Sequence, residues 1–473
     1  MISNFKPIYL LGLGVLSISL AHMNVSMDLA GWLTCVPFLV YLRQTNGAKS
    51  KWLFLFGLIA AWSVCIAKIV SPPMPFAMIF LFSIPISLFH LPGYLVWDRY
   101  KDRSLGLLLF PCVMVIMEWI QYNFTPFASW GVAAYTQSHS LNIMQSASLF
   151  GMPGLSFIIY WVNCSIAEWI VKKSTTKLSF QIPLSVCLFL ILFGSLRFEL
   201  SKASSKEMIK VAAVGTDSQV GGFPLPSKES NDIVKHDLFK RTEMAALNGA
   251  RLIVWNEAAT FILPEEEMMW MDSLSALTKR LQVELVAAFI IPLSSKPLKY
   301  KNMYLFYDKY GNLRYTYNKH QPVPGEPAEK GQEVLKVFDI SGVTTGAAIC
   351  YDYDFPYLAK SYGDLNADLV AVPSSDWRGI DPLHSRMAAF RAVEQGHSII
   401  RSTRFGLSAA ISPYGEFLAQ MSSYDSNDKV MMAHLPAQGV KTIYNLIGDT
   451  LVYLCFGFLF YFIYKQKNII VKV

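Results

Sequence analysis

Three residues that could carry out acyl chemistry each follow a short apolar run in the second half of the chain. They are Glu257, Lys319 and Cys350. In layered α/β folds, binding and catalytic residues gather where strands end. If the three runs are strands of one domain, a carboxylate, an ammonium group and a thiol could therefore meet. For any one charged residue taken alone, the more common alternative is a solvated position on the surface.

Cys350 stands apart from the other cysteines of the chain. There are seven cysteines, and the other six lie in apolar segments that we expect to cross a membrane. Cys350 therefore has no disulfide partner in the remainder of the chain. A buried core thiol is the alternative interpretation, because unpaired cysteines are among the most buried residues.

The chemistry open to this trio is nucleophilic attack on a carbonyl group. A cysteine thiol is only slightly ionised at neutral pH, so it needs a base or a cation nearby. Glu257 could accept the thiol proton as a general base. Lys319 could stabilise the oxyanion that forms, and the backbone N–H of Tyr351 could be the second donor.

Other chemistries fit the sequence less well. The chain has no HExxH motif and no closely spaced cysteine pair of the kind that binds zinc. Its histidines His320, His384, His397 and His434 are scattered along the second half. The segment GLSAA at 406–410 lacks the second glycine of a serine nucleophile elbow. We therefore expect no metal and no cofactor.

The elements that must position these residues alternate between strands and helices from residue 199 to residue 443. Apolar runs bounded by turn residues predict strands, two pairs of which read as hairpins. The expected strands are Lys210–Val214, Leu252–Trp255, Leu285–Ile291, Met303–Tyr307, Leu313–Tyr317, Leu335–Ile340, Thr344–Ile349, Leu369–Val372, Leu407–Ser412 and Glu416–Gln420. Amphipathic patterns predict helices over Ser227–Asn248, Pro264–Arg280 and Pro382–Gln395. This alternation indicates a layered α/β domain with a mixed sheet. The run Met268–Met271 fits either the core face of a helix or a lid that dips into lipid.

The first part of the chain has the composition of a membrane protein. Overall, 53% of the residues are hydrophobic and only 16% are charged, and the apolar residues are concentrated in long runs. We expect a membrane domain with seven transmembrane helices over residues 1–198, an outward domain over 199–443, and an eighth transmembrane helix with a short tail over 444–473. The predicted spans are Pro7–His22, Leu29–Leu42, Trp52–Val70, Phe76–Val96, Leu105–Tyr122, Leu155–Val171, Ile182–Phe198 and Leu446–Tyr464. The alternative for the first two is a single re-entrant hairpin.

The distribution of basic residues predicts the orientation of these spans. Lysine and arginine fill the flank before the first span and the loops after the second, fourth, sixth and eighth, whereas the alternate short loops have none. By the positive-inside rule, both ends of the chain are cytoplasmic and the long domain faces outward. The basic flanks account for the net charge of +7, so no nucleic-acid partner is implied.

Three ionisable residues, Lys68, Glu118 and Glu168, fall near the ends of predicted spans. Residues of this kind can mark a transport pathway, but near a span end a long side chain can also reach the membrane interface. The loop 123–154 has no Asp, Glu, Lys or Arg, though it contains His139. It could line an access path for a lipid beside the outward domain, or it could be an ordinary interfacial loop.

The motifs around the three site residues resemble the nitrilase, or carbon–nitrogen hydrolase, superfamily. The matching segments are VWNEAA around Glu257, YNKHQPVPGE around Lys319 and AAICYD around Cys350, followed by PSSDW at 373–377, FRAVEQG at 390–396 and GLSAAISPYG at 406–415. The resemblance implies an αββα sandwich with a Glu-Lys-Cys triad. It also makes Glu326 the candidate for the second glutamate of the family.

The order of the domains is similar to that of the apolipoprotein N-acyltransferase family. This resemblance implies an acyltransferase of the bacterial cytoplasmic (inner) membrane, acting as a monomer on its outer face. Cys350 would take an acyl chain from a phospholipid as a thioester, and the α-amine of a diacylated lipoprotein would accept it. The alternatives are a membrane-tethered amidase, a related acyltransferase with another acceptor, and a non-catalytic lipid or lipoprotein chaperone.

The chain departs from the pattern of that family in three places. Asn256 replaces the proline of a usual Trp-Pro-Glu, and the loop between Lys319 and Glu326 is one residue shorter and lacks an aromatic residue. The family usually has Cys-Tyr-Glu at the nucleophile, whereas this chain has Asp352 in place of the glutamate after Tyr351. Tyr351 and Asp352 are therefore expected to support the site rather than to react.

Overall fold

The computed structural model describes residues 5–72, 74–103, 105–172, 177–203, 207–220 and 225–470 of the chain. It divides into two compact units, one formed by Met1–Lys202 with Leu446–Val473 and the other by Ala203–Asn445. Of the predicted basic flanks, Lys173 and Lys472 lie outside the described residues.

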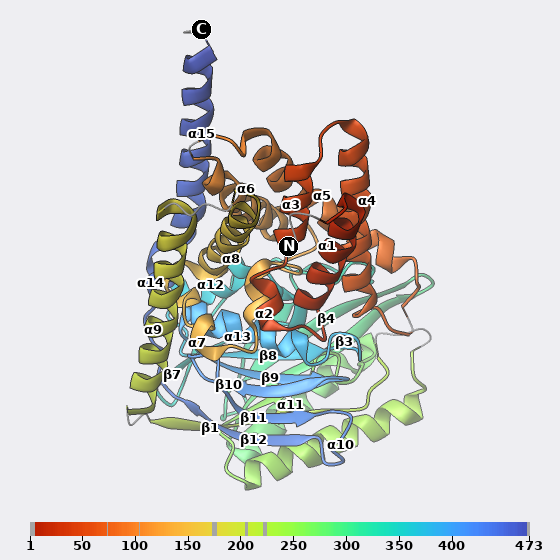
Figure 1. Ribbon diagram of the computed structural model, residues 1–473. Coiled ribbons are helices and arrows are strands. Elements are labelled where there is room, and N and C mark those ends of the chain that lie inside the picture. The colour runs from red at the N-terminus through yellow and green to blue at the C-terminus, as the bar shows by residue number, and fades with distance from the viewer. Residues whose placement is uncertain are drawn as a thin grey trace. The chain divides into compact units, whose positions relative to one another are not determined.

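The first unit is helical (Figure 1). Its helices are α1 (Pro7–Ala21), α2 (Asp28–Gly31), α3 (Val36–Gln44), α4 (Ala48–Ala67), α5 (Met78–Tyr100), α6 (Gly106–Phe124), α7 (Leu141–Met144), α8 (Ala147–Lys172), α9 (Ile182–Ala203) and α15 (Thr450–Ile470), with a 3₁₀ turn η2 (Ala133–Gln137). Within the described residues, α4, α5, α6, α8 and the segment Ser179–Ser201 are long and apolar enough to cross a membrane. The chain is therefore a multi-pass membrane protein.

The second predicted span, Leu29–Leu42, is not one continuous helix. α2 ends at Gly31 and α3 begins at Val36, and the side chain of Asn163 fills the break. Its Oδ1 accepts the backbone N–H of Cys35 at 2.7 Å, and its Nδ2 donates to the carbonyl of Gly31 at 3.0 Å. The break persists because these backbone groups are hydrogen bonded inside the protein.

Glu118 does not reach the membrane interface as its place near a span end suggests. It is buried in the helical unit. Its Oε1 accepts the backbone N–H of Ala133 at 2.8 Å and the hydroxyl of Tyr160 at 2.6 Å. The uncharged loop 123–154 is thus folded onto α6 and α8, with much of its middle part buried.

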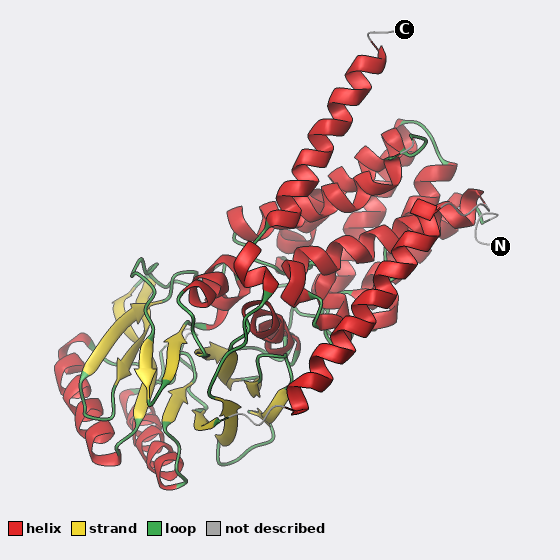
Figure 2. Ribbon diagram, turned by 90° about the vertical axis from the view of Figure 1, so that its left-hand side faces the viewer, coloured by secondary structure: helices red, strands yellow, loops and turns green. Residues whose placement is uncertain are grey.

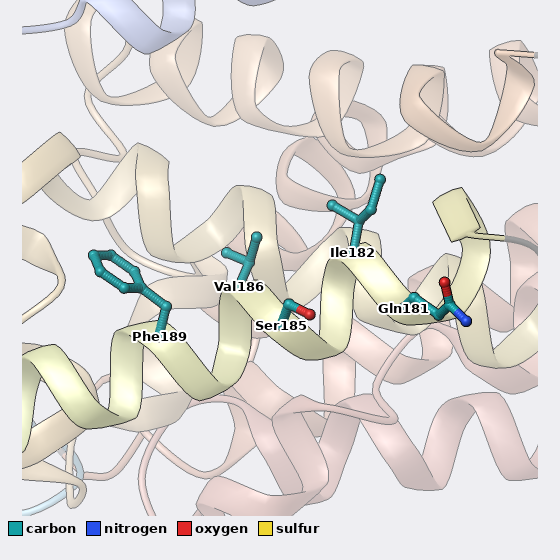
Figure 3. Close-up of a pocket in the computed structure, with 5 residues that line it drawn as sticks. All are labelled: Gln181, Ile182, Ser185, Val186 and Phe189. Carbon is teal, nitrogen blue, oxygen red and sulfur yellow. The ribbon is translucent and has the colours of Figure 1, made fainter.

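The helical unit also carries a hollow of about 490 Å³ along one side of α9. It is lined by Gln181, Ile182, Ser185, Val186 and Phe189, whose side chains follow the helix (Figure 3). None of the site residues predicted from the sequence lines it.

The second unit is an αββα sandwich, which confirms the predicted fold class (Figures 1 and 2). One sheet has the order β12-β1-β2-β3-β4-β5 and the other β11-β10-β9-β8-β7-β6, and both mix parallel and antiparallel pairs. The strands are β1 (Met208–Val214), β2 (Leu252–Trp255), β3 (Glu284–Ser295), β4 (Leu298–Tyr307), β5 (Leu313–Asn318), β6 (Phe338–Ile340), β7 (Val343–Ala347), β8 (Leu369–Ser375), β9 (Ser398–Arg404), β10 (Leu407–Ile411), β11 (Phe417–Ser422) and β12 (Val430–Pro436). Helices α10 (Lys228–Leu247) and α11 (Glu267–Leu281) cover the first sheet, and α12 (Pro356–Asp364) and α13 (Leu383–Gln395) lie on the other side.

The strand sequences explain why the sheets are buried on both faces. Val211 and Val254 point into the core between the sheets, where they join Ala371 and Ile400. Their neighbours along β1 and β2 point the other way and pack under α10 and α11. Because successive side chains alternate between faces, a strand covered on both sides needs a nearly continuous apolar run. Such runs are what made β1, β2 and β8 predictable.

Three elements of the sandwich were not predicted. β9 pairs parallel with β8 inside the second sheet, β12 pairs antiparallel with β1 at the edge of the first sheet, and α12 follows directly on the cysteine turn. The Met268–Met271 run is only partly buried, and its role as a lid stays a prediction. Trp270 packs in the core, whereas Met268 and Met269 are exposed. An apolar run on a helix covers more than the face that packs inward.

Candidate active site

Each of the three candidate residues lies just past a strand end of the sandwich. Glu257 follows β2, Lys319 follows β5, and Cys350 opens the 3₁₀ turn η5 (Cys350–Asp354) shortly after β7. All three are almost fully buried. The backbone N–H of Glu257 donates to the carbonyl of Ser374 on β8 at 3.2 Å, so residues of both sheets meet here.

Lys319 lies between two carboxylates. Its Nζ donates to Oε1 of Glu257 and to Oε2 of Glu326, both at 2.7 Å. The side-chain amide of Asn302 on β4 bridges the same two acids, with its Nδ2 at 2.7 Å from Glu257 and 2.8 Å from Glu326. Burial acts to lower the pKa of Lys319, but the two carboxylates outweigh it and hold that pKa well above its usual range. The ammonium group is thus permanently charged and fixed in place.

Cys350 is held in an unusual backbone conformation. Its φ is +47°, in the left-handed region that side chains other than glycine seldom adopt. Its Sγ lies 3.7 Å from the carbonyl oxygen of Ser375. Burial, and then the charge of Glu257, raise the pKa of the Cys350 thiol well above its usual value, although Lys319 opposes them. The resting thiol is therefore neutral and needs a base to react.

Asp352 ties the cysteine turn to the loop that carries Lys319. Its Oδ2 accepts the hydroxyl of Tyr317 at 2.9 Å and the backbone N–H of Ile349 at 3.1 Å. Its Oδ1 accepts the backbone N–H of Gln321 at 2.6 Å. The carboxylate is completely buried, which raises its pKa to about 7 despite these donors. Although aspartate is shorter than the usual glutamate, both of its carboxylate oxygens are hydrogen bonded here, with three donors in all.

We expect the Asp352→Asn variant to be less stable by about 1–3 kcal/mol. Asparagine has one acceptor oxygen, so its NH₂ group would face a backbone N–H that now has a carboxylate oxygen. The exposed Asp339 accepts one backbone N–H, from Gly342, and Asp339→Asn should change stability by less than about 0.5 kcal/mol. Unfolding midpoints of the two variants in detergent check this. Equal midpoints would mean that Asp352 is not the link described here.

Tyr351 and Glu326, the other two supporting residues expected at the site, have different contacts. The Tyr351 ring packs edge-to-face on Phe355, with 5.4 Å between ring centroids. The role of its backbone N–H as an oxyanion donor stays a prediction. Glu326 contacts Lys319, and its Oε2 also accepts the backbone N–H of Val323 at 2.9 Å. Burial acts to raise its pKa, but Lys319 outweighs it and lowers that pKa.

Sequence reasoning missed a histidine beside the thiol. Sγ of Cys350, a carboxylate oxygen of Asp376 and a ring nitrogen of His384 lie within 4.8 Å of one another. These are metal-ligand types, but Arg401 already donates to both oxygens of Asp376, at 2.8 and 3.0 Å. Asp376 and His384 are therefore engaged in an ion-pair network with Arg401. Asp376 lies in the PSSDW motif, whereas nothing in the sequence alone pairs it with His384.

Two further residues close to the site have no motif of their own. Asn302 is a buried polar residue in the middle of β4, and only strand pairing brings it to Glu257. Arg404 is buried, and its Nε donates to the hydroxyl of Ser375 at 2.9 Å. Burial lowers the pKa of Arg404, against the opposing charge of Glu257.

Two family models match the chain and together cover most of it. Residues 14–165 match the apolipoprotein N-acyltransferase N-terminal domain, and residues 204–444 match carbon-nitrogen hydrolase. Similar proteins include the apolipoprotein N-acyltransferase of Borreliella burgdorferi, 24% identical over 395 residues, or 75% of this chain and 70% of that protein. The apolipoprotein N-acyltransferase of Rickettsia bellii is 24% identical over 452 residues, or 88% of each chain.

Among solved structures, similar ones include an amidase and a carbon-nitrogen hydrolase. An amidase from Nesterenkonia sp. superposes with a TM-score of 0.40 at 18% identity, covering 50% of this chain and 93% of the other. A carbon-nitrogen hydrolase from Helicobacter pylori gives a TM-score of 0.41 at 18% identity over 49% of this chain and 90% of the other.

Proposed function

We propose, for a chain that belongs to the carbon–nitrogen hydrolase family and within it to the apolipoprotein N-acyltransferases, that Glu257, Lys319 and Cys350 perform its acyl transfer. The enzyme moves an acyl chain from a phospholipid to the α-amine of a diacylated lipoprotein. The observation that carries the assignment of residues is the buried contact of Lys319 with Glu257 at 2.7 Å, beside a thiol that both residues influence electrostatically.

In the first half-reaction, Glu257 takes the proton of the neutral Cys350 thiol as the sulfur attacks the ester carbonyl of the phospholipid. The negative charge that develops on the carbonyl oxygen is stabilised by Lys319, whose position is fixed by its two carboxylate partners. The tetrahedral intermediate collapses to a thioester, and the leaving alkoxide takes the proton back from Glu257. A lysophospholipid departs.

In the second half-reaction, the α-amine of the lipoprotein attacks the thioester carbonyl. Glu257 accepts a proton from the amine, and Lys319 again stabilises the oxyanion. The C–S bond breaks, the amide forms, and Cys350 regains its proton from Glu257. The buried position of all three groups supports this sequence, because a thioester survives only where water is scarce.

We also propose that the catalytic unit faces outward from the cytoplasmic membrane, in a protein with eight spans. The support is the confinement of basic residues to alternate loops. One copy of the chain suffices, because Glu257, Lys319 and Cys350 belong to the same unit. No nucleic acid takes part.

Replacing Glu257 by glutamine is expected to slow thioester formation by about 10²–10⁴-fold, which is the usual contribution of a general base. The amide oxygen can still accept from Lys319 and Asn302, so the fold should be kept. Glu284 is a matched control: it is also buried, burial raises its pKa to about 7, and it lies at the start of β3. Glu284→Gln should leave the rate within a few-fold of wild type. Similar rates for the two variants would remove Glu257 from the role of base.

The proposed function is tested with purified enzyme, a phospholipid and a synthetic diacylated lipopeptide. Release of lysophospholipid together with a triacylated peptide is the expected result. An amidase would instead release ammonia from simple amides and leave the phospholipid intact. A chaperone would bind the lipopeptide without changing its mass, and Cys350→Ser would still complement in cells. Either outcome would contradict the proposal.

A further inference from the structure

A charged network lies directly behind the nucleophile and is not used by the steps above. His384, in the first turn of α13, has its Nδ1 at 2.7 Å from Oδ1 of Asp376 and its Nε2 at 2.9 Å from Oδ1 of Asp354. Arg401 on β9 donates to Asp376 and also to the hydroxyl of Ser385 at 2.8 Å. All of these side chains are buried.

The geometry fixes the charge of the imidazole. A carboxylate can only accept hydrogen bonds, and His384 faces one with each ring nitrogen, so an imidazolium with a proton on each nitrogen satisfies both contacts. Burial acts to lower the pKa of His384, but Asp354 and Asp376 outweigh it and raise that pKa to about 9. One contact opposes this arrangement: a guanidinium nitrogen of Arg401 lies 2.8 Å from Nδ1. Asp376 lies between the two cations and accepts from both, which offsets their repulsion.

The network connects the cysteine turn to the second sheet. Asp354 is the last residue of η5, and Cys350 is the first. Asp376 directly follows β8, and Arg401 lies in β9. Through its Nε2–H, His384 thus holds Asp354, the last residue of the strained turn, to the second sheet. A residue held at positive φ stays there only when its surroundings are fixed in this way.

We propose that His384 is a positioning residue of the acyl transfer, which as an imidazolium clamps Asp354 and so holds Cys350 in its reactive conformation. This inference rests on the proposed function for its substrate but not for its geometry. His384 touches neither substrate nor reacting atoms in this role. It acts through the turn that carries the thiol.

The clamp has a defined pH dependence. The groups that face His384 are Asp354 and Cys350 from η5, Asp376 beyond β8, and Arg401 from β9. Its pKa in the folded protein lies above the value of about 6.5 in an unfolded chain. The stabilisation is therefore complete below pH about 6.5 and is lost as the pH rises through about 9. The acylation rate should decline over the same alkaline range.

The test is His384→Gln in the full-length enzyme, with phospholipid as the substrate. Glutamine keeps a donor nitrogen but carries no charge. We expect thioester formation to be about 10–100-fold slower at pH 7, with an unchanged KM for phospholipid. The alkaline decline near pH 9 should disappear. His434→Gln, at an exposed position on β12, is the matched control and should behave as wild type.

A second variant keeps the proposal testable if His384→Gln does not fold. Asp354→Asn retains an acceptor for Nε2–H but removes a charge that raises the pKa of His384, so the alkaline decline should move to lower pH. A wild-type rate and pH profile in His384→Gln, or an unmoved decline in Asp354→Asn, would overturn the proposal.

Alkylation of Cys350 by iodoacetamide, followed on its peptide by mass spectrometry, separates this inference from the proposed function. We expect it to be at least about tenfold slower in His384→Gln at pH 7, because the turn would no longer hold the thiol in its reactive conformation. If the wild type forms no thioester, the proposed function fails, and the alkylation rates still decide on the clamp. Equal rates in the two proteins would contradict it.

Discussion

The Cys350→Ala variant is expected to form no thioester, with a loss of rate above about 10⁴-fold. The Cys350→Gly variant should lose the same activity. Of the two variants, however, Cys350→Gly should be the more stable. The reason is the φ of +47° at this position. Glycine adopts this conformation freely, but alanine is strained there, so glycine should be favoured by about 1 kcal/mol. Unfolding midpoints of the two variants measure the difference.

The matched control for that experiment is Cys187→Ala. Cys187 lies on α9 in the helical unit and is partly exposed, so its loss should leave thioester formation unchanged. If Cys350→Ala were as stable as Cys350→Gly, the turn would not be strained at the nucleophile. If Cys350→Ala retained activity, the thiol would have no chemical role.

The Lys319→Met variant should lose both activity and stability. The side chain of methionine is similar in length but cannot donate, so Glu257 and Glu326 become two buried carboxylates without their shared cation. Breaking a buried ion pair from one side costs about 3–5 kcal/mol. Loss of an oxyanion donor costs about 10²–10³-fold in rate. A chemical denaturation curve and the rate of lysophospholipid release measure the two effects.

The double variant Lys319→Met with Glu326→Gln separates these two effects. Removing the charge of Glu326 should restore part of the lost stability, because one unpaired carboxylate is gone. Activity should not return, since no ammonium group faces the oxyanion. Recovery of activity in the double variant would show that Lys319 serves only to neutralise the acids.

Much of the sandwich could be predicted because its strands are short apolar runs that end at turn residues. β1, β2 and β8 are covered on both faces, so each is a nearly continuous apolar run, which favours a buried strand. The edge strand β12 was missed because it contains an exposed histidine, His434, and so does not read as a continuous apolar run. The break between α2 and α3 was missed because Asn163, far along the chain, is what satisfies it.

The site residues also differ in whether the sequence alone could predict them. Cys350 and Lys319 could be singled out because each follows a strand and carries a reactive side chain. Asn302 and His384 could not, since their importance depends on partners that lie 45 and 30 residues away along the chain. Asp352 read only as a departure from a motif. Its three partners come from separate elements, and their common position is visible only after folding.

The central claim is that Cys350 carries the acyl group between donor and acceptor. The most direct measurement is the mass of the peptide containing Cys350 after the enzyme has met a phospholipid without any acceptor. We predict a gain of one acyl group on Cys350, which hydroxylamine removes and which is absent from Glu257→Gln over the same time. An unmodified Cys350, or an acyl group found on another residue while lysophospholipid is released, would contradict the account.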